Sequence, residues 1–138
     1  MVRNFRVSTL SSLRKLKRVY AYWWTLAYCY DGNADKIIEN LIASYCDAKN
    51  YWRANEKEID FIVQNNKKII PIEVKKKKNL EKTDINHMSY FLKKYKIKKG
   101  YFTYNGEETS SSSGSSMMFF MPFWKWLLDF EGILANKP

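Results

Sequence analysis

The sequence has few of the residues from which zinc sites, disulfide frameworks and nucleotide-binding loops are built. Its 138 residues include one histidine, two cysteines (Cys29 and Cys46) and five glycines. Two cysteines are too few for a disulfide framework, and with a single histidine they make a poor zinc site. No pair of glycines has the spacing of a P-loop or a dinucleotide-binding turn, which excludes nucleotide binding through those motifs. We therefore expect free thiols and a reducing, cytoplasmic environment.

Long apolar runs are also missing. No run reaches the roughly 18 residues that a membrane-spanning helix needs, so we expect no membrane span. Residues 19–30 are aromatic and follow the basic stretch 14–18, which is the order found in a signal peptide. The segment is rich in tyrosine, however, and no small-residue cleavage site follows it. We interpret it as a buried element of the domain rather than a leader or a membrane-surface segment.

Positive charge is abundant. Lysine and arginine total 24 against 14 acidic residues, for a net charge of +10. A domain this basic is expected to bind an anionic partner, such as nucleic acid, an acidic membrane surface or an acidic protein. Residues 1–18 contain six basic residues and no acid, so we expect a basic arm there and a single domain over residues 19–138.

The spacing of apolar residues predicts an α/β domain with a central mixed β-sheet flanked by helices. We expect helices over residues 35–47, 83–94 and 122–130, with Asn33 and Thr83 as caps of the first two. Strands are expected over residues 50–53, 58–64, 69–75, 100–104 and 117–121. The serine-rich segment 109–116 predicts a mobile loop.

The two strands 58–64 and 69–75 form the most informative stretch. Their alternation places Ile59, Phe61 and Val63 on one face and Asp60 on the other. A four-residue turn over residues 65–68 would set Asp60 directly opposite Glu73, with facing Cβ atoms about 5 Å apart. Lys75 projects on the same face as Glu73. Ile62 and Ile69 share this charged face, so another element is expected to cover part of it.

Two carboxylates held side by side repel each other unless a cation lies between them. An oxygen-rich pair suits Mg²⁺, with Mn²⁺ as an alternative, and a neighbouring lysine can stabilise charge on a phosphate oxygen. Glu39, on the preceding helix, could supply a third carboxylate. The plainer interpretation is a solvated strand face on which Lys75 neutralises Glu73. Lysines flank the site and suit a phosphate backbone: Lys67, Lys68, Lys76, Lys77 and Lys78. A second basic patch, with Lys93, Lys94, Lys96, Lys98 and Lys99, is typical of a solvated helix end.

Three strings of residues resemble the restriction-endonuclease-like superfamily, known by its PD-(D/E)XK motif. They are Tyr51-Trp52-Arg53, Glu58-Ile59-Asp60-Phe61 and Ile70-Pro71-Ile72-Glu73-Val74-Lys75. More narrowly, the chain is similar to the nuclease-like domain at the carboxy-terminal end of a group of archaeal and bacterial P-loop ATPases. The resemblance covers roughly residues 19–130.

The resemblance implies a metal bound by Asp60, Glu73 and Glu39, with Lys75 assisting the attacking water and the scissile phosphate. It implies the restriction-endonuclease-like fold. Because the chain has no P-loop, the domain stands alone, partners with a separate ATPase or is a remnant, and these alternatives stay open. A homodimer is a further possibility, since cutting both strands of DNA usually needs two sites. The resulting hypothesis is a Mg²⁺-dependent nuclease that acts on DNA. Two alternatives stay open: a nucleic-acid-binding module that does not cut, and a protein-interaction domain that uses residues 19–30.

Overall fold

The structure is a computed structural model that describes residues 3–4, 18, 20, 33–65 and 68–135. Its elements follow in the order β1 (Arg3–Asn4), α3 (Ala34–Tyr45), β2 (Asn50–Ala54), β3 (Lys57–Asn65), β4 (Lys68–Lys75), α4 (Lys82–Tyr95), β5 (Lys99–Tyr104), β6 (Thr109–Ser113), β7 (Ser116–Pro122) and α5 (Phe123–Ala135). The strands form one seven-stranded sheet in the order β1-β2-β3-β4-β5-β7-β6. The neighbouring strands β4, β5 and β7 are parallel, whereas β2–β3, β3–β4 and β6–β7 are antiparallel. The predicted α/β class, a central mixed sheet flanked by helices, is confirmed.

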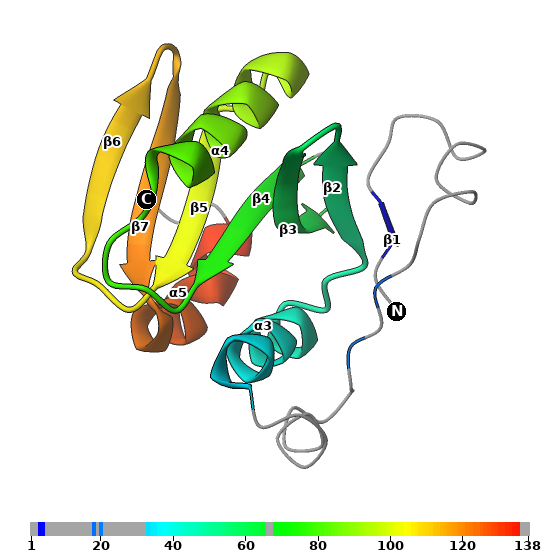
Figure 1. Ribbon diagram of the computed structural model, residues 1–138, viewed down its shortest axis with the longest axis vertical. Coiled ribbons are helices and arrows are strands. Elements are labelled where there is room, and N and C mark those ends of the chain that lie inside the picture. The colour runs from blue at the N-terminus through cyan, green and yellow to red at the C-terminus, as the bar shows by residue number, and fades with distance from the viewer. Residues whose placement is uncertain (1–2, 5–17, 19, 21–32, 66–67, 136–138) are drawn as a thin grey trace.

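Helices cover both faces of the sheet (Figure 1). Trp126 and Phe130 of α5 and Ile42 of α3 pack against Phe61 and other residues of one face. On the other face, α4 places Met88, Phe91 and Leu92 in a second cluster with Ile59, Ile62 and, at its margin, Ile69. The prediction that another element covers Ile62 and Ile69 is confirmed, and that element is α4. No helix among these residues is long and apolar enough to cross a membrane.

The first turns of α3 and α4 are capped by side chains. The Asn33 side chain accepts a hydrogen bond from the Asp35 amide at 2.9 Å, as the sequence predicted. At α4 the cap is Glu81, not Thr83: the Glu81 and Asp84 side chains and backbones form a reciprocal capping box. The prediction of Thr83 was wrong because Asp84 lies three residues after Glu81, the spacing of a capping box.

The alternation expected along β3 is interrupted. The pairing Asn50↔Ile62 changes to Trp52↔Ile59, so β3 contains one residue more than β2 between these pairs. Such a bulge turns the following side chains to the other face. Ile59 therefore packs against α4, while Phe61 and Val63 pack on the opposite face, and the prediction that all three share one face was wrong for Ile59.

The serine-rich segment differs from the prediction of a loop. Residues 109–113 form the edge strand β6, which pairs with β7 from Thr109↔Phe120 to Ser113↔Ser116. Each residue from 109 to 112 is exposed. Serine buries little apolar surface, so composition alone suggested a loop, and β7 supplies the backbone partners that composition cannot show. Gly114 has a φ of 61° in the connecting turn, a conformation that glycine adopts without strain.

Several predictions fall on residues outside those described, including most of the basic arm 1–18, most of the aromatic segment 19–30, Cys29 and Lys67. Cys46 is a free, buried thiol, and its burial raises its pKa to about 12. The inert character of this thiol agrees with the expectation of a structural cysteine.

Candidate functional site

The candidate site lies where the ladder between β3 and β4 ends. The paired register runs from Asn65↔Lys68 to Phe61↔Ile72, so the next residues along the two strands are Asp60 and Glu73. This register is the one that the four-residue turn predicted. The bulge in β3 occurs at the same place, between Ile59 and Ile62.

Side chains replace the backbone ladder at this point. The Asp60 amide donates to Oε2 of Glu73 at 3.2 Å, and the Val74 amide donates to Oδ2 of Asp60 at 3.0 Å. Each carboxylate therefore accepts a backbone hydrogen bond from the opposite strand. This exchange fixes the two carboxylates relative to each other without a metal ion, and it leaves one oxygen of each for another partner.

The second oxygen of Glu73 is bound by Lys75. The Lys75 ammonium lies 3.0 Å from Oε1 of Glu73 and 3.2 Å from Oδ1 of Asp84, on the first turn of α4. The Glu73 side chain is only 6% exposed, whereas that of Lys75 is 32% exposed. Lys75 therefore connects the buried carboxylate to the protein surface.

The second oxygen of Asp60 faces Arg18. The Arg18 guanidinium lies 3.5 Å from Oδ1 of Asp60 and 3.4 Å from Oε1 of Glu39, and it also contacts Glu58. The central carbon (Cζ) of the Arg18 guanidinium is 4.7 Å from the centre of the Tyr51 ring, which is a cation–π geometry. One guanidinium therefore contacts three carboxylates from α3 and β3.

Tyr20 completes the contacts of Glu39. Its hydroxyl donates to Oε1 of Glu39, the same oxygen that Arg18 approaches. Burial, followed by the charge of the Glu39 carboxylate, raises the pKa of Tyr20. Tyr20 therefore stays protonated as a hydrogen-bond donor. It holds the Glu39 carboxylate against Arg18, which also contacts Asp60.

The electrostatics of the pair are unfavourable for two negative charges. Burial, followed by repulsion from Glu39, raises the pKa of Asp60 above its ordinary range. Burial, followed by repulsion from Asp60, raises the pKa of Glu73 as well. Burial is the largest single influence on the pKa of Lys75 and would lower it, but the charge and hydrogen bond of Glu73, together with the charges of Asp60 and Asp84, raise that pKa. Lys75 is therefore an ammonium ion at neutral pH, while the carboxylate pair attracts either a proton or a cation.

A hollow of about 360 Å³ opens beside this pair. The starts of α3 and α4 border it through Asp35, Glu81 and Asp84, and Asp60 and Lys75 line it from the sheet. Glu39, Lys76 and Lys77 also line it. The structure thus brings Glu39, Asp60 and Lys75 to one hollow, with Glu73 held directly behind through Asp60 and Lys75.

The donor set fits a hard divalent cation in part. Mg²⁺ takes one or two carboxylates and keeps several waters, which Asp60 and Glu73 could provide. Over the described part of the chain, no three acidic, histidine or cysteine side chains converge as a ready metal-binding group. Arg18 and Lys75 instead bind the two oxygens that a cation would need. A metal ion at this pair would therefore have to displace the Arg18 contact.

The predicted basic flank is only partly assembled. Lys76 and Lys77 line the hollow, and Lys78 is exposed directly after them. Lys68 lies at the opposite end of β4, where its ammonium is 3.4 Å from the carbonyl oxygen of Leu134. Lys67 is outside the described residues. Part of the expected phosphate-binding surface therefore lies at the site, and Lys68 belongs to another surface.

Sequence reasoning missed two charged residues of the site. Arg18 was assigned to the basic arm, and nothing in its local pattern distinguishes it from its basic neighbours. Asp84 could have been found, because its spacing from Glu81 is that of a capping box and because α4 follows the lysine-containing end of β4. Tyr51 was named only as part of the Tyr51-Trp52-Arg53 string, and its contact with Arg18 was not predicted.

The chain was compared with protein families, with curated proteins and with solved structures. No curated protein and no solved structure matches it. A family model described as a domain of unknown function, DUF4143, matches residues 35–126, which is two thirds of the chain and includes Glu39, Asp60, Glu73 and Lys75. The chain therefore belongs to the DUF4143 family.

Proposed function

We propose that this domain is a Mg²⁺-dependent nuclease that hydrolyses phosphodiester bonds in DNA. The observation that carries the proposal is the pair of a buried Glu73 and a partly buried Asp60, fixed by reciprocal backbone hydrogen bonds where β3 and β4 part, with the Lys75 ammonium 3.0 Å from Glu73. Burying two adjacent carboxylates costs stability, and such pairs are concentrated at functional sites. The resemblance to PD-(D/E)XK nucleases supports the same assignment.

The acidic and basic residues of the site have different proposed roles. Asp60 and Glu73, with Glu39, would hold the cation. Bound Mg²⁺ or Mn²⁺ would lower the pKa of a coordinated water and neutralise charge on a phosphate oxygen. Lys75 is protonated at neutral pH, so it serves as a donor to the phosphate oxygen and not as a base.

Five carboxylates line the hollow beside its lysines: Asp35, Glu39, Asp60, Glu81 and Asp84. A bound cation would offset part of this negative charge and allow a phosphate backbone to approach. Lys76 and Lys77 line the hollow, and the first turns of α3 and α4 border it. Contacts of these lysines with phosphate are independent of base identity, so we expect backbone binding with little sequence readout. Assembly as a homodimer is part of the same proposal, because cutting both strands usually needs two sites, and a separate ATPase chain as partner rests on the resemblance.

A second candidate function is a nucleic-acid-binding module that does not cut. The contacts of Arg18 with Glu39, Glu58 and Asp60 favour it, because an internal cation already neutralises the carboxylates. In this case binding would depend on salt but not on divalent metal.

The test is cleavage of labelled single-stranded, duplex and branched DNA in Mg²⁺, Mn²⁺ or EDTA. Glu73→Gln removes the charge without changing the shape, and Glu107→Gln is the matched control at an exposed position after β5. Because a neutral amide at position 73 avoids burying a charge, we expect the variant to remain folded, as thermal unfolding would show. Metal-dependent cutting that is lost in Glu73→Gln and kept in Glu107→Gln would support the nuclease. Binding without cutting in every metal would refute it in favour of the second candidate.

A further inference from the structure

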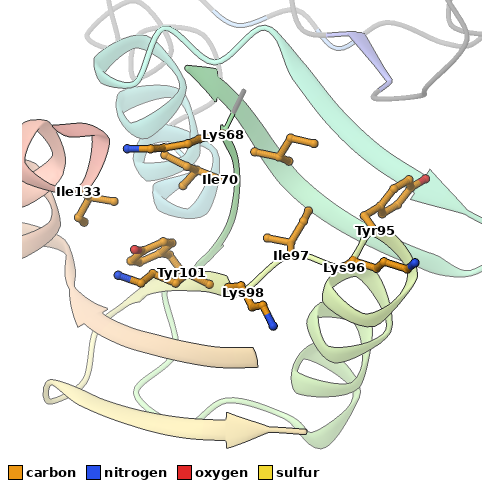
Figure 2. Close-up of a pocket in the computed structure, with 10 residues that line it drawn as sticks. Lys68, Ile70, Tyr95, Lys96, Ile97, Lys98, Tyr101 and Ile133 are labelled. Carbon is orange, nitrogen blue, oxygen red and sulfur yellow. The ribbon is translucent and has the colours of Figure 1, made fainter. Parts of the chain in front are cut away.

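A second basic surface lies at the other end of the sheet, around the connection between α4 and β5. A hollow of about 570 Å³ opens there, shown in Figure 2. Its apolar residues include Ile69, Ile70, Ile97 and Ile133, together with the rings of Tyr95 and Tyr101. Four lysines surround them: Lys68, Lys96, Lys98 and Lys99. None of the described residues that line this hollow is acidic.

A neighbouring hollow of about 710 Å³ shares Lys96 and Lys98 with the first. Its remaining walls are polar and come from α4, β6 and the turn before β7: Ser89, Lys93, Ser113, Gly114, Ser115 and Ser116, with Leu92. The hydroxyls of Ser89 and Ser113 lie 2.5 Å apart, which links α4 to the edge of the sheet. No described lining residue is acidic here either.

The two hollows therefore differ in chemistry on either side of Lys96 and Lys98. One offers an apolar floor, at which the ring of Tyr101 is stacked on Phe119 and that of Tyr95 packs on Phe91. The other offers ammonium donors and the hydroxyl of Ser115, because the Ser116 hydroxyl donates to the carbonyl oxygen of Ile97. Both lysines are exposed, and no ion pair joins either of them to a described acidic residue. Figure 2 shows the Lys98 ammonium directed away from Ile97.

We propose that these paired hollows bind single-stranded nucleic acid, with a base on the apolar floor and the adjoining phosphates on Lys96, Lys98 and the hydroxyl of Ser115. The first hollow lies within the roughly 300–1,000 Å³ that small ligands occupy, so it can accept a nucleobase. A chain of phosphates needs several cations and no nearby carboxylate, which both hollows satisfy. The proposal takes from the proposed function only the expectation that the ligand is a nucleic acid.

A single strand fits better than the alternatives. The bases of a duplex are stacked inside the helix and cannot reach an apolar floor without unpairing. An unpaired base exposes its ring face to aromatic and apolar side chains. An acidic peptide would satisfy the lysines, but it would not require an apolar floor beside them.

The surface is separate from the carboxylate site. Lys68 begins β4 and Lys75 ends it, and a strand of this length spans about 23 Å. A strand of nucleic acid held at the Lys68 end would therefore be anchored away from Asp60 and Glu73, which lie toward the opposite end of β4. The two sites can accordingly be tested independently.

The test is fluorescence anisotropy with a labelled oligothymidylate of about 15 nucleotides, in EDTA so that no cleavage is needed. The variant is Lys96→Gln/Lys98→Gln, and the matched control is Lys49→Gln/Lys82→Gln, which removes two exposed lysines that line neither hollow. Loss of two phosphate contacts should lower the slope of log K against log salt by about 1.4, which is about 25-fold in affinity at 0.1 M salt.

Three comparisons decide the outcome. The proposal expects the oligothymidylate to bind more tightly than a duplex of equal length and more tightly than an abasic strand, with the loss confined to Lys96→Gln/Lys98→Gln. Equal loss in the Lys49→Gln/Lys82→Gln control would overturn it, as would binding of the abasic strand or of polyglutamate with the affinity of the oligothymidylate. Tight binding by Glu73→Gln would show that this surface acts even if the nuclease assignment fails.

Discussion

Replacing Arg18 by glutamine tests whether the carboxylate site is built to hold a cation. The substitution keeps a polar side chain but removes the charge that lies against Glu39, Glu58 and Asp60. Without metal, Glu39, Glu58 and Asp60 then repel one another without the guanidinium between them. Lys75 still neutralises Glu73. The variant should therefore be less stable than the parent in EDTA and more responsive to Mg²⁺.

The size of the effect follows from the exposure of these side chains. Arg18 is 27% exposed, and its three partners are 15–29% exposed. Exposed ion pairs contribute about 0–1 kcal/mol, whereas breaking a buried pair costs about 3–5 kcal/mol. An intermediate site should lose about 2 kcal/mol, which corresponds to a fall in Tm of about 8 °C for a domain of this size.

Magnesium should reverse much of this loss. In the variant, Oδ1 of Asp60 no longer faces a guanidinium, so the ion binds without displacing one. A ligand at about 100 times its Kd stabilises the folded state by about 2.7 kcal/mol. We therefore expect Mg²⁺ to raise the Tm of Arg18→Gln by several degrees more than that of the parent.

The assay is calorimetric unfolding in EDTA and in Mg²⁺, with Arg53→Gln as control. Arg53 is 59% exposed, and its guanidinium lies 3.5 Å from Oε2 of Glu58, at the edge of the same carboxylate group. Its loss should lower stability by less than about 1 kcal/mol. Equal stability of Arg18→Gln and the parent in EDTA, or an equal response of both to Mg²⁺, would refute the reasoning that Arg18 occupies a cation site.

Three more predictions concern the protonation of the carboxylate pair, the packing at Gly100 and the pairing of β6. Burial raises the pKa of Glu73 and Asp60 in the folded protein, so the folded state holds their protons more tightly than the unfolded state. The contribution of these protons to the free energy of unfolding is therefore fully present below about pH 4 and is lost as the pH rises through the folded-state pKa values. Urea unfolding in EDTA should show Glu73→Gln gaining stability over the parent between about pH 5 and pH 8, and parallel curves would contradict this. Gly100→Ala places a Cβ 2.8 Å from the sulfur of Met88, so it should destabilise by about 1–3 kcal/mol in chemical unfolding, and a neutral effect would show that α4 moves freely over β5. Amides of β6 that pair with β7 should exchange with deuterium more slowly than those of Asn105–Glu107, and equal rates would contradict the edge strand.

Much of the fold could be predicted from the sequence, because it depends on local patterns. Apolar spacing identified every strand from β2 to β5, and the Asn33 cap gave the start of α3. The length of the turn between β3 and β4 fixed the register that sets Asp60 against Glu73. These features depend on residues close together in the chain, where period and turn chemistry are informative.

The parts that could not be predicted depend on contacts between distant segments. The bulge in β3 is a mismatch with β2, and no period within β3 alone reveals it. Arg18 reaches Glu39, Glu58 and Asp60 across 21 to 42 positions of sequence. The strand β6 exists because β7 supplies its hydrogen-bond partners, and its own serines give no strand signal.

The distribution of charge along α4 has an ordinary explanation, and the carboxylate pair does not. Asp84 in the first turn and Lys93 and Lys94 in the last turn complement the helix dipole, so they would stabilise α4 in a protein of any function. Glu73 stabilises no helix, is 6% exposed and lies beside another carboxylate whose pKa is also raised. Apolar residues at such positions are commonly neutral or stabilising, because they avoid the loss of hydration. Folding alone therefore does not account for Glu73 and Asp60, and this is the reason for our proposal that the pair holds a cation.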